Sequence, residues 1–468
     1  MYCMPVHETA RQKRRILAAS ILGSGAVFLE GTVVTVALPA IGRDFGLGMD
    51  GLQWVVNAYL LTLGSLILLG GALGDRYRRD LIFRVGALGF AVTSGLCAIA
   101  PSAGTLAILR FVQGVAGAML VPNSLALLEE TFSGEERGAA IGKWAAGSAA
   151  WTALGPVVGG AIVSAISWRW VFALVVPFAL GAALLLPRRG AESSGAQPDV
   201  RVDYAGAVLV TAGLGALVGA LITGPVRGFS DALVLGGIAG GALLLIAFFA
   251  VEARSRHPLV PLEVFRVQQF SGANAATFLI YGALGAMLFL LILVLQNALG
   301  YSALQAGSSL LPVNALLVLG SSYAGRLAGR VGARLPMTVG AMVAGAGLAL
   351  LVRLDRDAAY VTHVLPGILV FGLGLTALVA PLTSAVLESL GKERAGLASG
   401  ANNAVARMAG LIATAAIPLA AGLGGMENPS GDPLLRGFRT AMWICAALCA
   451  AGGVVSWLTI RGRGADER

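Results

Sequence analysis

The sequence predicts an all-α integral membrane protein with fourteen transmembrane helices. The mean hydropathy is +0.82, 57% of the residues are hydrophobic and only 12% are charged, whereas a soluble domain is about a quarter charged. The apolar residues gather into stretches of about 20 residues, the length that crosses roughly 30 Å of hydrocarbon. The 65 glycines also fit helices that approach closely in lipid.

The apolar stretches fall into three groups along the chain. Six are expected at 16–39, 52–74, 82–100, 104–127, 139–163 and 168–187, two at 204–222 and 232–251, and six more at 270–297, 305–325, 335–352, 362–386, 396–424 and 438–460. Charged stretches separate the groups. The sequence therefore predicts an N-terminal six-helix bundle (1–187), a cytoplasmic linker (188–203), two inserted transmembrane helices (204–251), a second cytoplasmic linker (252–269) and a C-terminal six-helix bundle (270–468).

Most of the 33 Lys and Arg residues fall in the tails and in alternate loops. Since such loops stay in the cytoplasm and an even number of spans brings both ends to one side, both termini are expected to be cytoplasmic, in the bacterial inner (plasma) membrane. The net charge of +9 is spread over many loops instead of one stripe. This distribution argues against a nucleic-acid partner.

A weak internal repeat relates the two predicted bundles. The segment 71–76 aligns without gaps on 325–330, and in the same register Val85-Gly-Ala matches Val339-Gly-Ala. Parallel repeats of this kind serve alternating-access transporters, in which one half rocks against the other around a midplane site. A chance match between Gly-rich loops is the alternative.

Glu30 is the one carboxylate that lies well inside a predicted span, and an ionisable residue there is expected to be paired or functional. Counting about 1.5 Å per residue places Arg110 of the fourth span at a similar depth, so the two could pair. Burial opposes the carboxylate charge and a guanidinium supports it. We therefore expect Glu30 to carry a proton and Arg110 to tune its affinity. A permanent salt bridge that only fixes helix register is the alternative.

Short motifs follow one another in a fixed order. They are LEGTVVTVALPAI at 29–41, QWVVNAYLL at 53–61, GALGDRYRRD at 71–80, LAILRFVQGVAG at 106–117, GPVVGG at 155–160, WRWVF at 168–172, GYSALQAG at 300–307 and the segment 396–407. Together they resemble the major facilitator superfamily, specifically its fourteen-span drug:proton antiporter branch. The resemblance covers nearly the whole chain. It implies the major facilitator fold, a proton gradient as the driving force with no cofactor or metal, and multidrug efflux.

The resemblance also implies roles for individual residues. The loop after the second span is similar to the family's gating loop, and the fifth span carries its antiporter motif, where Pro156 removes a backbone hydrogen bond and favours a bend. The expected gating residues are Asp75, Arg76 and Arg79, and the expected hinge residues are Gly155, Pro156, Gly159 and Gly160. A solvated loop charge and static close packing are the respective alternatives.

The chain departs from the family pattern at several positions. Glu30 replaces the usual Asp, Arg78 stands where a Gly is expected, and Asp80 where a basic residue is common. Trp151 replaces a small residue and is expected either to border the substrate cavity or to restrain the hinge. Gly329 occupies the position in the second gating loop that an acid holds in the first, so a charge lock is expected in the N-terminal half alone.

A substrate cavity of this class is mostly apolar with few polar anchors. The candidate lining residues are Trp54, Tyr59, Phe111, Gln113, Trp151, Phe278, Tyr281 and Arg407. Because the C-terminal half has no second buried acid, we expect doubly charged cations to be poorer substrates than monovalent cationic or neutral lipophiles.

The sequence thus favours a proton-coupled exporter of lipophilic small molecules, drugs or secondary metabolites, that works as a monomer in the lipid bilayer. A narrow-specificity metabolite or lipid exporter remains an alternative, as does a non-transporting scaffold or sensor. Three scattered histidines without ligand-type spacing argue against an enzyme. The absence of a Gly-rich Lys-Ser/Thr nucleotide-binding loop argues against direct ATP drive.

Overall fold

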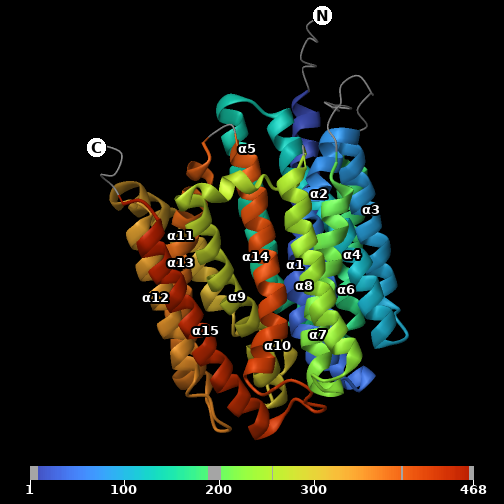
Figure 1. Ribbon diagram of the computed structural model, residues 1–468, viewed down its shortest axis with the longest axis vertical. Coiled ribbons are helices and arrows are strands. Elements are labelled where there is room, and N and C mark those ends of the chain that lie inside the picture. The colour runs from blue at the N-terminus through green and yellow to red at the C-terminus, as the bar shows by residue number, and fades with distance from the viewer. Residues whose placement is uncertain (1–8, 188–201, 256, 392–393, 463–468) are drawn as a thin grey trace, which may run out of the picture.

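The computed structural model describes residues 9–187, 202–255, 257–391 and 394–462, and within these ranges every regular element is a helix. Among the described residues, thirteen helices are long and apolar enough to cross a membrane, and α6, with 17 residues, is a shorter apolar helix. The helices run side by side in one bundle (Figure 1). The predicted all-α membrane fold is therefore confirmed. Most of the expected linker 188–203 lies outside the described residues.

The N-terminal half consists of α1 to α6. Their bounds are α1 Ala10–Phe45, α2 Met49–Tyr77, α3 Arg79–Ala98, α4 Ala103–Thr131, α5 Gly134–Ala165 and α6 Arg169–Leu185. Thr9 begins α1 with a capping box that includes Gln12, and α1 ends at Gly46, whose φ of 64° suits glycine. Ser102 caps α4 by accepting a hydrogen bond from the backbone N–H of Thr105. Helix α1 therefore extends beyond both ends of the predicted span 16–39, whereas α4 begins next to its predicted start at 104.

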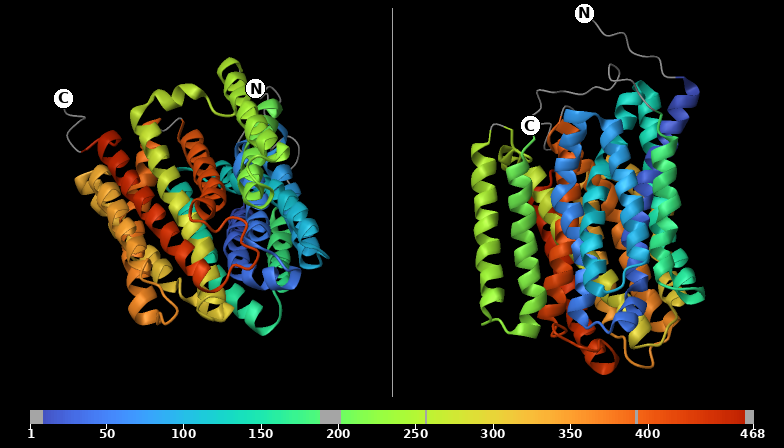
Figure 2. Two further views of the ribbon diagram at one scale, coloured as in Figure 1. Left: turned by 60° about the horizontal axis from the view of Figure 1, so that its bottom comes forward. Right: turned by 90° about the vertical axis from the view of Figure 1, so that its right-hand side faces the viewer.

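The two inserted helices are α7 (Tyr204–Arg227) and α8 (Ala232–Arg254). They pair with each other, and α7 also packs against α2 and α14, so the pair stands at the side of the bundle (Figure 2). Helix α8 continues to Arg254, beyond its predicted end. The expected linker 252–269 is not wholly irregular either, because it contains the 3-10 helix η2 (Leu262–Arg266).

The C-terminal half runs from α9 to α15. Its elements are α9 Gln268–Asn297, α10 Ala303–Ser308, α11 Leu311–Val331, α12 Arg334–Leu351, the π-helix η3 Tyr360–Val364, α13 Leu365–Ser389, α14 Ala395–Ala420 and α15 Gly431–Thr459. The span predicted at 305–325 is interrupted between α10 and α11. Pro312, in the first turn of α11, fits a helix start because its missing N–H would have no partner there.

The two halves use the same helix pairings. In the N-terminal half α2 and α3 pack on α4, α3 on α6, and α1 on α5 and α6. In the C-terminal half α11 and α12 pack on α13, α12 on α15, and α9 on α14 and α15. The packing thus repeats in the order that the internal sequence repeat predicts, as two six-helix bundles with two helices inserted between them.

The bundle has two faces that the chain ends distinguish. Helix α1 begins and α15 ends at one face, here the terminal face, and the α1–α2 connection lies at the opposite face (Figure 1). Gln296 donates a hydrogen bond to the carbonyl of Val36 at 2.9 Å, and the N–H of Met49 donates one to the carbonyl of Met426 at 2.8 Å. Among described residues, the hydrogen bonds between the halves lie from mid-bundle to the opposite face. The halves are therefore closed together there.

Candidate functional site

Glu30 of α1 and Arg110 of α4 form an ion pair inside the N-terminal half. The distance from Arg110 Nη1 to Glu30 Oε1 is 2.9 Å. Glu30 is 0% and Arg110 1% exposed. The structure therefore brings together the two residues that depth counting along the sequence placed at one level.

Arg110 is held from several helices. Its Nε donates to the carbonyl of Val55 at 3.1 Å, and its Nη1 also donates to Gln113 Oε1 at 2.7 Å. Gln113 in turn donates to Ser94 Oγ at 2.7 Å, and the Arg110 guanidinium lies 4.2 Å from the centroid of the Tyr59 ring. The guanidinium thus has a fixed place among α1, α2 and α4, which a lone salt bridge would not give it.

Glu30 is held much less completely than its partner. Its Oε1 accepts the bond from Arg110, whereas its Oε2 is buried with no hydrogen-bond partner among the described residues. An unsatisfied buried acceptor costs free energy, more so when charged. A proton on the carboxyl would remove that charge while Arg110 keeps its other bonds. Arg110 can therefore stay in place whether Glu30 is ionised or protonated.

Arg407 of α14 is the second cationic group in the middle of the bundle. The position of a Cβ at Gly64 would be 2.9 Å from Arg407 Cβ, so the side chain starts at the contact between α2 and α14. Its guanidinium lies 5.4 Å from the Phe28 ring of α1. Arg407 thus reaches from the C-terminal half toward the helix that carries Glu30.

The expected cavity residues do not share one cavity in the described chain. Tyr59 is buried against Arg110. Trp54 lies against α7, where a Cβ at Gly219 would be 3.3 Å from its ring. Trp151 packs 4.7 Å from the Phe178 ring, centroid to centroid. These aromatic residues therefore lie in helix contacts.

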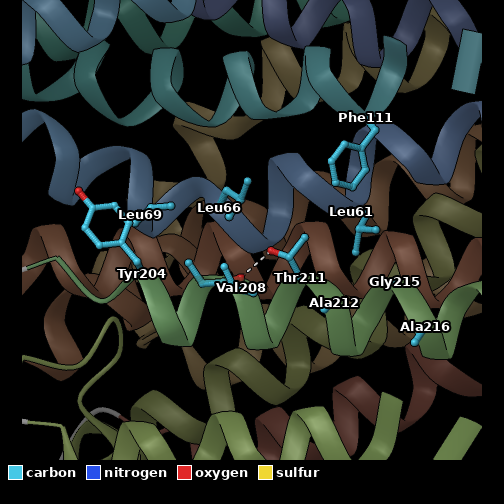
Figure 3. Close-up of a pocket in the computed structure, with 11 residues that line it drawn as sticks. Leu61, Leu66, Leu69, Phe111, Tyr204, Val208, Thr211, Ala212, Gly215 and Ala216 are labelled. Atoms are coloured by element: carbon cyan, nitrogen blue, oxygen red, sulfur yellow. Dashed lines mark hydrogen bonds between the residues drawn. The ribbon is translucent and has the colours of Figure 1, made fainter. Parts of the chain in front are cut away.

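The larger pocket, of about 420 Å³, lies between α2, α4 and the inserted helix α7 (Figure 3). It contains the exposed side chain of Phe111, and its walls are almost wholly apolar. Its position beside α7 puts it outside the contact between the two halves. The residues that line it are Leu61, Leu66, Leu69, Phe111, Tyr204, Ala207, Val208, Thr211, Ala212, Gly215 and Ala216.

A smaller pocket of about 120 Å³ lies between α9, α13 and α14 in the C-terminal half. Tyr281, an expected cavity residue, borders it, whereas Phe278 is exposed and does not. The other polar lining residues were not expected from the sequence, although amides and hydroxyls inside a predicted span were a signal. The lining residues are Tyr281, Thr383, Val386, Leu387, Ser399, Asn402, Asn403 and Ala406.

The expected gating residues lie at the terminal face. Arg79 Nη2 is 2.8 Å from Asp75 Oδ1, and its Nη1 is 3.9 Å from Glu130 Oε2. Arg76 lies over the Tyr77 ring at 5.3 Å. The Asp75–Arg79 pair therefore connects the end of α2 to α3, and Arg79 extends it to α4.

Two departures from the family pattern lie side by side in this loop. Arg78 has a φ of 129°, the one non-glycine residue of the described chain with a positive φ. Its guanidinium binds both carboxylate oxygens of Asp80, at 3.0 and 3.1 Å. The residue that replaces glycine in a backbone conformation suited to glycine is thus paired with the acid that replaces a base.

The expected hinge residues bring α5 close to two other helices. A Cβ at Gly155 would be 2.0 Å from Thr32 Oγ1, and one at Gly160 would be 2.4 Å from the carbonyl oxygen of Ala303. Gly307 of α10 approaches equally closely, since its Cβ would be 1.9 Å from the carbonyl oxygen of Pro156. Glycine is required here for close packing of α5 on α1 and α10.

Glu252 is a buried carboxylate that was not expected from the sequence. Glu252 lies in the last turn of α8, one residue past the predicted span, and is buried. It accepts hydrogen bonds from the backbone N–H groups of Leu259 and Val260, at 3.3 and 3.5 Å. Glu252 therefore fastens the start of the second linker, away from the Glu30 site.

The comparisons agree with this architecture. The family profile described as Major Facilitator Superfamily matches residues 20–415. The chain is 34% identical to the puromycin resistance protein pur8 of Streptomyces alboniger, over 97% of this chain and 92% of that protein. It is 32% identical to the tetracenomycin C resistance and export protein of Streptomyces glaucescens, over 86% and 74%. The crystal structure of the peptide transporter POT superposes with a TM-score of 0.69 at 14% identity, covering 95% of this chain and 93% of that one. The chain belongs to the Major Facilitator Superfamily and is a membrane transporter, not an enzyme.

Proposed function

We propose that the protein exports lipophilic small molecules across the inner membrane in exchange for protons, by alternating access. The observation that carries this proposal is the buried Glu30, bound to Arg110 at 2.9 Å through one oxygen while its other oxygen has no partner among the described residues. A titratable group kept inside a membrane span marks a proton or ion pathway by default. Proton coupling explains why an acid is kept at this position, whereas helix packing alone does not require one.

The position of Glu30 on α1 offers a route from the proton to the contact between the halves. Thr32, two residues further along α1, lies against Gly155 of α5, and Val36 accepts the hydrogen bond from Gln296 of α9. Helix α5 in turn packs on α10 of the other half. Protonation removes the attraction between Glu30 and Arg110, so α1 and the contacts it shares with α5 and α9 are free to shift.

The orientation of the chain defines the state that the structure represents. With both termini cytoplasmic, as the basic loops predict, the terminal face points to the cytoplasm and the closed opposite face points outward. Substrate would then enter from the cytoplasm. Binding of a proton from outside requires the alternate state, in which the contacts of Gln296 and Met49 with the other half are broken.

The names of the relatives support export of antibiotic-like compounds. One relative confers puromycin resistance, and another confers resistance to tetracenomycin C and exports it. These two compounds, with lipophilic dyes of different charge, form the first test panel. Transport of one structural class alone would favour the narrow-specificity metabolite or lipid exporter.

The test is transport by the purified protein in proteoliposomes with an imposed pH gradient. The wild type is expected to move at least one panel compound against its concentration gradient, and Glu30→Gln to lose gradient-driven movement while it still exchanges labelled for unlabelled compound. Glu136→Gln is the control, since Glu136 pairs with Lys13 at the exposed terminal face. Gradient-driven transport by Glu30→Gln at the wild-type rate would rule out Glu30 as the coupling residue, whereas failure of the wild type to move any panel compound would favour the scaffold or sensor alternative.

A further inference from the structure

Arg407 is a positively charged side chain in the middle of the bundle that lacks an acidic partner among the described residues. The titratable side chains near enough to act on it are Tyr59 and Tyr281, and within the described ranges no carboxylate pairs with it. Arg407 is half-buried, so part of its side chain is accessible. A guanidinium has five donors and stays charged, and inside a membrane span it needs an acceptor.

The surroundings of Arg407 are polar along one side of α14. Ser399, Asn403 and Arg407 follow one another at intervals of four residues and therefore share a helix face. Asn403 is exposed although it lies in the first half of a membrane span, which fits a water-filled space better than hydrocarbon. Ser399 and Asn403 line the pocket of about 120 Å³, together with Tyr281, and Ala406 next to Arg407 lines it too.

The pocket offers donors and no competing acid. Its polar groups are hydroxyls and amides, and no carboxylate is among its lining residues in the described chain. One amide is already committed, since Asn402 donates to Asn274 Oδ1 at 3.1 Å and to Thr277 Oγ1 at 2.7 Å. Those bonds hold α14 on α9, whereas Arg407 extends across to the Phe28 ring. A molecule in the pocket would lie beside Arg407, which follows Ala406 of the pocket wall and extends from α14 toward α1 and α2 of the N-terminal half.

We propose that Arg407, with Tyr281 and the pocket beside it, binds the acidic oxygen of an anionic lipophilic substrate, such as a carboxylate or an ionised phenol on an apolar body. The inference rests on the proposed export function and names its substrate class. It departs from the sequence-based expectation of monovalent cationic or neutral substrates. A cation would have to approach an uncompensated guanidinium, whereas an anion supplies the missing partner.

The anion site and the proton site are neighbours but distinct. The Tyr59 ring centroid lies 4.2 Å from the Arg110 guanidinium. Tyr59 is also close enough to interact electrostatically with both Arg110 and Arg407. An anion moving outward and a proton moving inward carry charge in the same sense, so an interior-negative membrane potential drives both. Export of the anionic class is therefore expected to accelerate when the interior is made negative with potassium and valinomycin.

The direct test is equilibrium binding of matched probes to the full-length protein in nanodiscs of zwitterionic lipid. Pyrenebutyrate carries the acid, and pyrenebutanol has the same apolar body without charge. The wild type is expected to bind pyrenebutyrate at least about tenfold more tightly, and Arg407→Gln to lose that preference, the equivalent of one hydrogen bond to a charged group. Arg407→Lys keeps the charge and should keep part of the preference. Arg353→Gln, at an exposed arginine of the opposite face, changes the net charge equally and should have no effect.

The outcomes separate this inference from the proposed function. Equal binding of the two probes by the wild type, or equal weakening of both by Arg407→Gln, overturns the anion site, because the second result is that of a residue that only supports the fold. Binding needs no gradient, so an Arg407-dependent preference for pyrenebutyrate without pH-driven transport would uphold the site and reject proton coupling. Glu30-dependent transport with no effect of Arg407→Gln on probe preference would uphold proton coupling and reject the anion site.

Discussion

Replacement of Arg110 by Gln should destabilise the protein far more than replacement of an exposed arginine. The change removes the guanidinium that bonds Glu30, the carbonyl of Val55 and Gln113 and that lies over Tyr59. It leaves a carboxylate that is 0% exposed without a counter-charge. Breaking a buried pair in this way costs about 3–5 kcal/mol. Glu30→Gln should cost less, about 1–3 kcal/mol, because Arg110 keeps two of its hydrogen bonds.

The double variant Glu30→Gln with Arg110→Gln isolates the pair. It contains no unpaired buried charge, so it is expected to be more stable than Arg110→Gln alone, with a coupling of about 2 kcal/mol. Denaturant or thermal unfolding of the purified protein in one detergent measures all four members of the cycle.

Arg169 and Asp44 provide the matched control pair in the same half. Their side chains are 37% and 43% exposed at a separation of 2.6 Å, and the same cycle there should give a coupling below about 1 kcal/mol. The reasoning is refuted if Arg110→Gln costs no more than Arg169→Gln, or if the effects of the two Glu30–Arg110 substitutions simply add.

Two further predictions concern backbone geometry. Arg78→Gly relieves a positive φ but deprives the buried Asp80 of its guanidinium, so it should cost about 1 kcal/mol, and adding Asp80→Asn should recover the loss when thermal unfolding is compared. If the double variant does not recover the lost stability, the ion pair with Asp80 does not offset the backbone strain at Arg78. Gly160→Ala forces α5 away from α10, where its Cβ would be 2.4 Å from a carbonyl oxygen, and should cost about 1–3 kcal/mol. Gly142→Ala on the same helix meets open space and should be neutral or slightly stabilising; a similar loss in both would show that the cost at Gly160 does not come from its contact with α10.

Much of the fold could be predicted from the sequence because the bilayer restricts it. Only long apolar helices satisfy their own backbone in hydrocarbon, so composition and stretch length lead directly to the helices. The sequence indicated that Glu30 and Arg110 could pair, because the constant rise of a helix places them at a similar depth. The strain at Arg78 had a signal too, in the replacement of an expected glycine.

Other features depend on lateral packing, which helix counting does not resolve. Trp54 was expected in the cavity but lies against α7, because nothing in the second span indicates which of its faces the inserted helices cover. The hydrogen bond from Gln113 to Ser94 joins α4 to α3, and its partner could not be chosen among several hydroxyls. Glu252 looked like a loop charge since α8 extends past the apolar stretch. The polar pocket beside Tyr281 combines three helices that are distant in sequence.

Proton movement coupled to substrate movement tests the central claim most directly. Proteoliposomes loaded with a pH-sensitive dye, such as pyranine, report lumenal pH when a transported compound is added without any imposed gradient. The wild type is expected to move protons opposite to the compound, and Glu30→Gln to leave the lumenal pH unchanged. A lumenal pH response in Glu30→Gln equal to that of the wild type would contradict the assignment of Glu30 as the proton carrier.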